Sequence, residues 1–128
     1  MNKFIVTEKQ GQLLLSLSAL LQRLTSLDIV LWAFRDITIR YPQPFGLSVS
    51  EFERLSRELA LGFAINDKDM QRFIKADVQI IDGCMDGYTD SSFRAPSLTI
   101  ECIDSTQWEI TTTSEALGKE LERRGFKR

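Results

Sequence analysis

The chain has 128 residues, 43% of them hydrophobic and 27% charged, which is typical of a single globular domain. No stretch approaches the roughly 18 apolar residues of a membrane-spanning helix, and residues 1–10 hold too short an apolar run for a secretory signal, so we expect a soluble, cytoplasmic protein with no membrane partner. Histidine is absent, which removes the usual general base near neutral pH and disfavours Ser-His-Asp and Cys-His catalysis.

The two cysteines argue against a metal centre. Cys84 and Cys102 stand far apart in the chain and form no C-x-x-C pair, so zinc and thioredoxin-like chemistry lack their usual ligand spacing. We expect two reduced thiols, one of them buried. The sequence predicts no metal and no cofactor.

Acidic side chains are concentrated in the middle of the chain, although the formal net charge is only −2. Residues 76–118 carry eight Asp and Glu side chains against the single Arg94, whereas the segments 1–75 and 119–128 are each net positive. A negative segment repels phosphate and suits a basic partner, and the short basic C-terminal stretch is too small to indicate nucleic-acid binding. We therefore expect no nucleic-acid partner.

The predicted elements begin with a helix near the N-terminus. Thr7 and Gln10 have capping-box spacing, and leucines recur at helical spacing over residues 13–24, a stripe too short for a coiled coil and therefore expected in the core. Residues 27–41 are rich in β-branched side chains and favour a strand, although their length would also suit a buried helix. Two prolines in the stretch 41–46 predict a loop after it.

Two helices are predicted in the middle of the chain. The first begins at a Ser48–Glu51 capping box and ends near Gly62. Its expected inward side chains are Phe52, Leu55, Leu59 and Leu61. A shorter helix over residues 67–76 follows, with two aspartates in its first turn, where the helix macrodipole favours negative charge.

After the third helix the pattern changes to short strands separated by stretches rich in Gly, Asp, Ser and Pro. The strand segments are VQIID (78–82), SLTIECID (97–104) and QWEITTT (107–113). A hairpin joins the last two, and a final helix is capped by Thr113 or Ser114 and ended by Gly125. We predict one α+β domain over residues 1–128, with an antiparallel sheet of three or four strands, including a C-terminal meander, packed against the N-terminal, middle and C-terminal helices.

The segment 82–90, DGCMDGYTD, places an aspartate at every fourth position around two glycines. An EF-hand calcium loop would use four of these residues, namely Asp82, Asp86, Gly87 and Asp90. Cys84, however, occupies loop position 3, where an oxygen ligand is needed. Phe93 occupies position 12, where the loop needs a bidentate glutamate. The flanking segments are also predicted strands, so the pattern disfavours calcium binding.

We favour a turn-rich connection between strands for the same segment, because Asp and Gly populate turns for backbone reasons alone. A second interpretation is a mobile acidic binding loop, in which Met85, Tyr88 and Phe93 are apolar anchors and the carboxylates meet Arg or Lys. A catalytic acid–base pair of aspartates is the weakest interpretation, because nothing else in the chain supplies a nucleophile, a metal cluster or a phosphate cradle. We predict no catalytic residue and no enzymatic activity.

The two tryptophans, Trp32 and Trp108, lie in apolar or strand-patterned segments and are expected in the core. Close to the first of them, Arg35 and Asp36 are expected to form an internal ion pair. The alternative is that they line a ligand pocket.

Glutamates alternate with apolar residues on the last two predicted strands. Glu101 and Glu109 are therefore expected on the polar face of the sheet, together with Thr99 and Thr111. The simplest role for such a face is solvation.

The whole-chain layout resembles a known class of bacterial proteins. The layout begins with a leucine-rich N-terminal helix and the Trp-containing segment LWAFRDI. A capped middle helix comes next, and then the segments QIIDGCMDGY and LTIECIDSTQWEITTTSEAL, the second of which ends in a helix. The pattern covers residues 27–124. This layout resembles small cytoplasmic immunity proteins of contact-dependent or type VI toxin–immunity pairs. The resemblance implies an α+β monomer that binds one cognate protein toxin in a 1:1 complex and covers its basic active-site cleft.

On this hypothesis the acidic middle segment forms the partner-binding surface. The candidate partner-binding residues are Asp82, Asp86, Tyr88, Asp90, Glu101, Asp104 and Glu109. Two alternatives stay open: a small-molecule-binding or enzymatic domain, with a pocket between sheet and helices that uses Trp32 and Arg35, and an adaptor that dimerises through exposed leucines.

Overall fold

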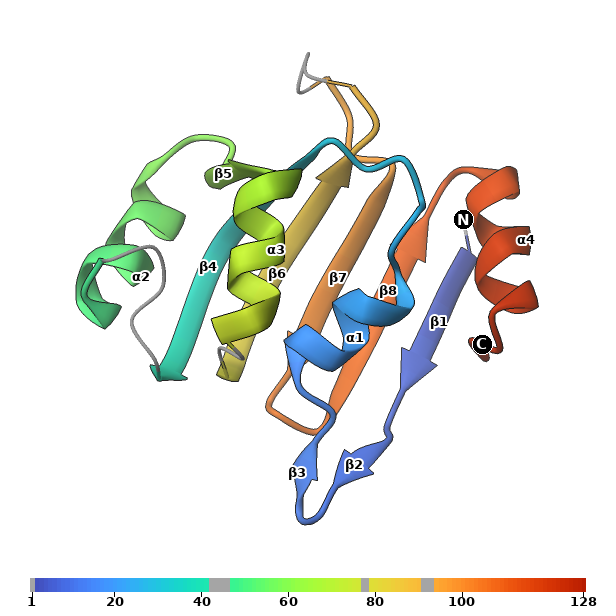
Figure 1. The fold of residues 1–128 in the computed structure, drawn as a ribbon, viewed down its shortest axis with the longest axis horizontal. Helices are drawn as coiled ribbons and strands as arrows, with labels where there is room; N and C mark the ends of the chain where they lie inside the picture. The colour runs from blue at the N-terminus through green and yellow to red at the C-terminus, as the bar shows by residue number, and fades with distance from the viewer. Residues whose placement is uncertain (1, 42–46, 77–78, 91–93) are drawn as a thin grey trace.

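Within residues 2–41, 47–76, 79–90 and 94–128, which the computed structural model describes, the chain forms a six-stranded antiparallel sheet and four helices (Figure 1). In sheet order the strands are β1 (Asn2–Val6), β8 (Gln107–Thr112), β7 (Leu98–Ile103), β6 (Gln79–Tyr88), β4 (Leu31–Tyr41) and β5 (Phe63–Asn66). The helices are α1 (Leu17–Arg23), α2 (Val49–Glu58), α3 (Asp67–Ala76) and α4 (Glu115–Arg123), and a small hairpin of β2 (Lys9–Gln10) and β3 (Leu13–Leu14) precedes α1. The predicted α+β class is confirmed, but the prediction of three or four strands is wrong.

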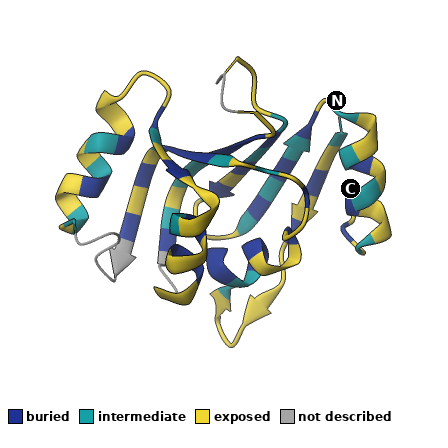
Figure 2. Ribbon diagram, turned by 45° about the horizontal axis from the view of Figure 1, so that its top comes forward, coloured by how far each residue is buried: buried dark blue, intermediate teal, exposed yellow. Residues whose placement is uncertain are grey.

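The core lies between the sheet and the helices α1 and α3, which cross the same face of the sheet (Figure 1). Because side chains alternate along a strand, one cross-strand row points to these helices from five strands. That row consists of Phe4, Ile110, Ile100, Met85 and Phe34, all fully buried. Figure 2 shows the same division, with buried residues along the strands and on the inward sides of the helices. Trp32 and Trp108 are also buried, as predicted.

The predicted N-terminal helix over residues 7–24 is wrong in its first half. The helix begins only after Ser16, whose hydroxyl oxygen accepts a hydrogen bond from the Ala19 N–H. Upstream, β1 pairs with β8 over its whole length, and the β2–β3 hairpin turns at Gly11, which has a φ of +67°. The strand pairing links residues about a hundred positions apart, so local helical spacing could not indicate it.

The two middle helices begin where the sequence predicts. The Ser48 hydroxyl caps α2 by accepting from the Glu51 N–H, and α3 carries two aspartates in its first turn, as predicted. The end of α2 was predicted wrongly: the helix stops at Glu58, and Leu59 and Leu61 are 45% and 50% exposed instead of turning inward. The short strand β5 that follows was not predicted. The predicted loop at 41–46 falls almost entirely outside the described residues.

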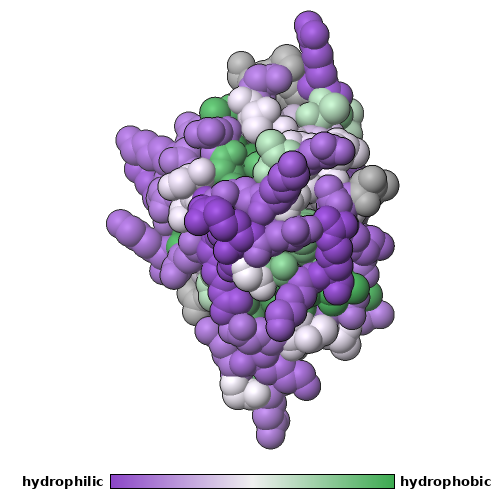
Figure 3. Space-filling model, turned by 90° about the vertical axis from the view of Figure 1, so that its right-hand side faces the viewer, coloured by the Kyte–Doolittle hydropathy of each residue, from purple (hydrophilic) through white to green (hydrophobic). Residues whose placement is uncertain are grey.

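Side chains and the C-terminal segment cover sheet edges that the strands leave open. Beyond the stretch paired with β5, the Ile37 and Ile39 N–H groups of β4 donate to the Ser56 hydroxyl and the Glu53 carboxylate of α2, each at 3.0 Å. At the opposite edge, the Ile5 N–H donates to the Lys127 carbonyl at 2.8 Å. Covered edges present fewer free backbone groups to other chains. The side of the molecule formed by β1 and α4 is mostly hydrophilic (Figure 3).

An ion-pair cluster joins α4 to the end of α1. Arg124 donates to the carbonyls of Arg23 and Thr25, at 3.0 and 2.6 Å, and it also donates to Glu120. Hydrogen bonds from Arg123 and then from Arg124 lower the pKa of Glu120 from 4.5 to about 2. The predicted closing helix is confirmed, with Ser114 as its N-cap and Gly125, at a φ of +93°, just after its end.

We expect the stabilisation supplied by Glu120 to disappear in acid. A carboxylate with a lowered folded-state pKa stabilises the fold above its unfolded value of 4.5, and this contribution is lost as the pH falls toward 2. Urea unfolding should therefore show Glu120→Gln to be less stable than the parent at about pH 6, with a much smaller difference at about pH 2. The same difference at both pH values would contradict this role.

Candidate functional site

The face of the sheet opposite α1 and α3 carries a polar surface at the end where β7 turns into β8. Alternation along the strands places Glu101, Glu109, Thr99 and Thr111 on this face, as the sequence predicts. In Figure 1, α2 and α4 flank the sheet at its two edges, while α1 and α3 lie in front of it. The opposite face is therefore where strand side chains meet solvent.

Two glutamates stand directly opposite each other on this surface. Glu101 of β7 pairs in register with Glu109 of β8. Glu109 forms an ion pair with Lys3 at 3.0 Å and accepts a hydrogen bond from the Gln107 side chain at 3.0 Å; the hydrogen bond from Lys3 is the main reason for its lowered pKa. Glu101 is exposed, and no described residue forms an ion pair with it. Like charges directly opposite on neighbouring strands repel each other, and the Lys3–Glu109 ion pair offsets part of this repulsion.

Two aspartates lie at the same end of the sheet. Asp82 precedes the Gly83–Cys102 pair of β6 and β7, and Asp104 follows β7 in the hairpin turn with a φ of +48°; both are exposed. We call Asp82, Glu101, Asp104 and Glu109 the acidic end of the sheet. The sequence predicted all four as partner-binding residues, and the structure brings them together.

Burial and the nearby carboxylates raise the pKa values of both thiols at this end of the sheet. Burial raises the pKa of Cys102 to about 11, with further contributions from the charges of Asp82, Asp104 and Glu101. Burial likewise raises the pKa of Cys84 to about 11, and Glu101 adds to that effect. Both cysteines are free, and Cys102 is buried, in agreement with the prediction. Thiols with such pKa values are poor nucleophiles at neutral pH.

Asp86 has a structural position and does not belong to this surface. Its carboxylate accepts from the Arg35 guanidinium at 2.5 and 3.2 Å and from the Thr99 hydroxyl at 2.8 Å, which joins β4, β6 and β7. The Asp86 side chain is only 4% exposed, and its hydrogen bond is the main cause of a raised pKa at Arg35. The predicted ion pair between Arg35 and Asp36 is wrong, because Asp36 is exposed at an irregularity of β4 with a φ of +52°.

The interpretation of residues 82–90 as a turn or a mobile loop is also wrong for most of the segment, since β6 runs through it to Tyr88. Met85 and Tyr88 are buried and offer no free anchor to a partner, and burial raises the pKa of the Tyr88 hydroxyl. Asp90 is exposed just beyond the strand, and Phe93 lies outside the described residues. Asp86 and Tyr88 therefore do not belong to the acidic end because they are buried. Asp90 does not belong to it because it lies beyond the last residue of β6.

Sequence patterning missed an apolar feature beside the same face. Leu59 and Leu61 are exposed in the segment that joins α2 to β5. A Cβ atom at Gly62 would lie 2.8 Å from the Arg35 side chain, so this segment packs next to the sheet face that carries Arg35. Helical periodicity predicted inward leucines here, but the chain leaves the helix at the extended residue Leu59, before Gly62, where the sequence predicts the helix end.

The described residues contain no group of three or more side chains arranged to hold a metal ion. None of their helices is long and apolar enough to cross a membrane. Comparisons with protein-family models, curated proteins and solved structures gave no significant match.

Proposed function

We propose that the domain is an immunity protein that binds a basic toxin domain through the acidic end of its sheet. The observation that supports this most is the exposed Glu101 directly opposite Glu109, with Asp82 and Asp104 nearby. A cationic side chain of a partner could contact both glutamates at once, and binding would then relieve the repulsion between them. The resemblance of the chain to immunity proteins adds to this reasoning.

The proposed inhibition requires no chemistry from this protein. Negative charge gathered on one surface attracts a basic cleft over long distances and raises the association rate. Apolar contacts then slow dissociation. The exposed apolar side chains on or beside this face include Ile5, which pairs with Glu109, and Leu59 and Leu61. The toxin is inhibited because its active-site cleft is occupied.

Capture of the partner from the native host tests this proposal. Tagged protein should recover one stoichiometric partner that carries a basic domain, and raised salt should weaken the recovery. We expect Glu101→Lys to weaken the affinity by a factor of about ten or more, because it replaces attraction with repulsion at the contact. The same substitution should make the free protein slightly more stable, by up to about 1 kcal/mol, because it creates an opposite-charge cross-strand pair with Glu109.

The matched control is Glu122→Lys, which makes the same charge change in the last turn of α4, away from Leu59 and Leu61. Glu122 forms an exposed ion pair with Arg128, which contributes little to stability, and a lysine suits the C-terminal end of a helix. Partner recovery that falls equally in both variants would show that only net charge matters. Recovery of no partner by a well-folded monomer would count against the immunity function.

A further inference from the structure

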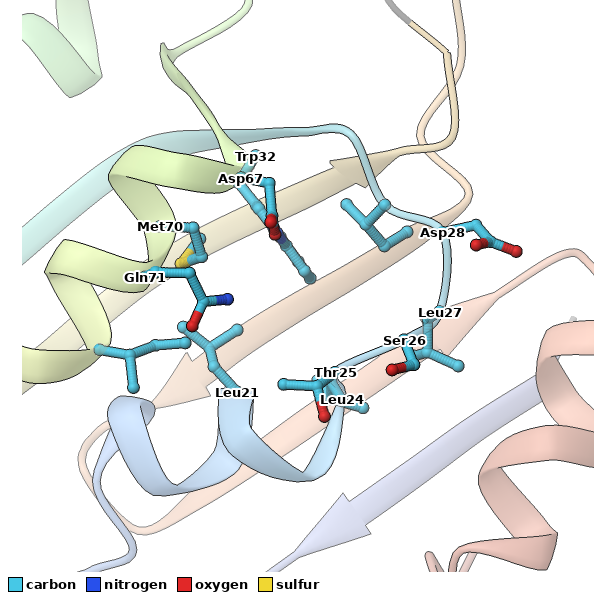
Figure 4. A pocket seen from close by; sticks show the side chains of 12 residues that line it. Leu21, Leu24, Thr25, Ser26, Leu27, Asp28, Trp32, Asp67, Met70 and Gln71 are labelled. Carbon is cyan, nitrogen blue, oxygen red and sulfur yellow. The ribbon is translucent and has the colours of Figure 1, made fainter.

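A cavity of about 350 Å³ lies on the other face of the sheet, between α1, α3 and the segment that joins α1 to β4 (Figure 4). Its apolar lining includes Leu21 of α1, Leu24 just after that helix, Met70 of α3 and Trp32 of β4. This volume is within the usual range for small-molecule sites.

The polar lining is negative. The charged side chains among the described lining residues are Asp67 and Asp28, both acidic. In Figure 4 the Asp67 side chain extends from the start of α3 toward the cavity and the Gln71 amide points into it, whereas the Asp28 carboxylate points away. Asp67 has no ion-pair or hydrogen-bond partner for its side chain among the described residues. Together with Asp69 in the same helical turn, its charge outweighs the partial positive charge at the start of α3.

The cavity is formed before any ligand binds. Ser26 and Asp28 have φ values of +66° and +59°, a conformation that costs energy in residues other than glycine. Arg124, the residue just after α4, fixes the same segment by donating to the Thr25 carbonyl at 2.6 Å. A Cβ atom at Gly87 would lie 3.0 Å from the Trp32 ring, so the glycine allows the indole to lie close against β6. A rigid wall and a fixed ring reduce the entropy lost on binding.

We propose that this cavity binds a small organic cation, an ammonium group attached to an apolar body. The ammonium group would donate to Asp67 through a charge-assisted hydrogen bond, and Trp32, which is 4% exposed, belongs to the same lining. Gln71 supplies a further polar contact, and the apolar body lies among the leucines and Met70. The site is on the opposite face from the acidic end of the sheet and does not depend on the proposed function.

Titration of ¹⁵N-labelled protein with phenethylammonium tests the site, with 2-phenylethanol and 3-phenylpropanoate as neutral and anionic analogues. We expect a saturable shift of the Trp32 indole N–H signal, with the Trp108 signal unchanged. The neutral analogue should bind about five to ten times more weakly, as expected for loss of one charge-assisted hydrogen bond, and the anion should bind more weakly still.

Asp67→Asn should remove the preference for the cation, whereas Asp69→Asn should keep it. Both variants lose one charge in the first turn of α3, but Asp69 does not line the cavity and instead lies 3.7 Å from Arg72. Three results would overturn the proposal. The anion could bind as tightly as the cation, or both variants could lose the same amount of affinity for the cation. The third is a titration that does not saturate at about 10 mM ligand, well above a millimolar dissociation constant.

Discussion

Replacing Arg35 by alanine should destabilise the protein more than replacing its partner Asp86 by asparagine. The Asp86 side chain is 4% exposed and that of Arg35 is 39% exposed, so the two substitutions leave different groups behind. Without Arg35, the buried carboxylate retains the Thr99 hydroxyl as its one side-chain donor among the described residues, and we expect a loss of about 3 kcal/mol. Without the Asp86 charge, Arg35 can turn toward water and asparagine can still accept from Thr99, so the expected loss is about 1 kcal/mol.

Urea unfolding at neutral pH measures the two losses in the free energy of unfolding. Arg54→Ala is the control, because Arg54 pairs with Glu58 where both side chains are more than half exposed. Such a pair should change stability by less than about 0.5 kcal/mol. Equal losses for Arg35→Ala and Asp86→Asn, or a larger loss for the second, would mean that burial of the carboxylate does not determine the effect.

The second large effect is expected at Gly83. This residue has a φ of +130°, and a Cβ atom there would lie 2.8 Å from the Ile37 Cα and 2.9 Å from the Asp36 carbonyl oxygen. Both neighbours are backbone atoms of the irregular part of β4, so they cannot move aside as a side chain would. We expect Gly83→Ala to cost about 3 kcal/mol or more, from backbone strain and overpacking together.

Gly11→Ala separates the two causes. Gly11 has a φ of +67°, but a Cβ atom there would meet nothing within 4 Å, so only the conformational cost of about 1 kcal/mol should appear. Thermal unfolding of both variants checks the order. If Gly83→Ala costs no more than Gly11→Ala, the close approach of β4 and β6 at this point is not a constraint.

Gly83 and Gly87 explain why the sequence predicts a turn over residues 82–90 where the structure has a strand. Asp and Gly at these spacings have the composition of a turn, and local propensity therefore predicts one. In the structure, Gly83 makes room for the irregularity of β4 and Gly87 makes room for the Trp32 ring. Both needs come from another strand, about fifty residues earlier in the chain, and tertiary contacts override local propensity.

Other parts of the fold were predictable because their signals are local. The caps at Ser48 and Ser114 act on amides three residues away, and the Glu101–Glu109 pair follows from one short hairpin between neighbouring strands. The Arg35–Asp86 pair joins residues 51 positions apart, across a strand pair with register shifts, and no sequence pattern indicates it. The same holds for β1, whose partner β8 lies at the other end of the chain.

The most direct test of the proposed function is the map of backbone amide shifts when labelled protein binds its captured partner. The largest changes should lie in β7, β8 and their turn, at Glu101, Asp104 and Glu109, with smaller changes near Leu59 and Leu61. The Trp32 indole signal should change little, because the cavity is on the other face of the sheet. Changes concentrated on α1 and α3, with β7 and β8 unaffected, would contradict the assignment of the acidic end of the sheet as the partner-binding surface.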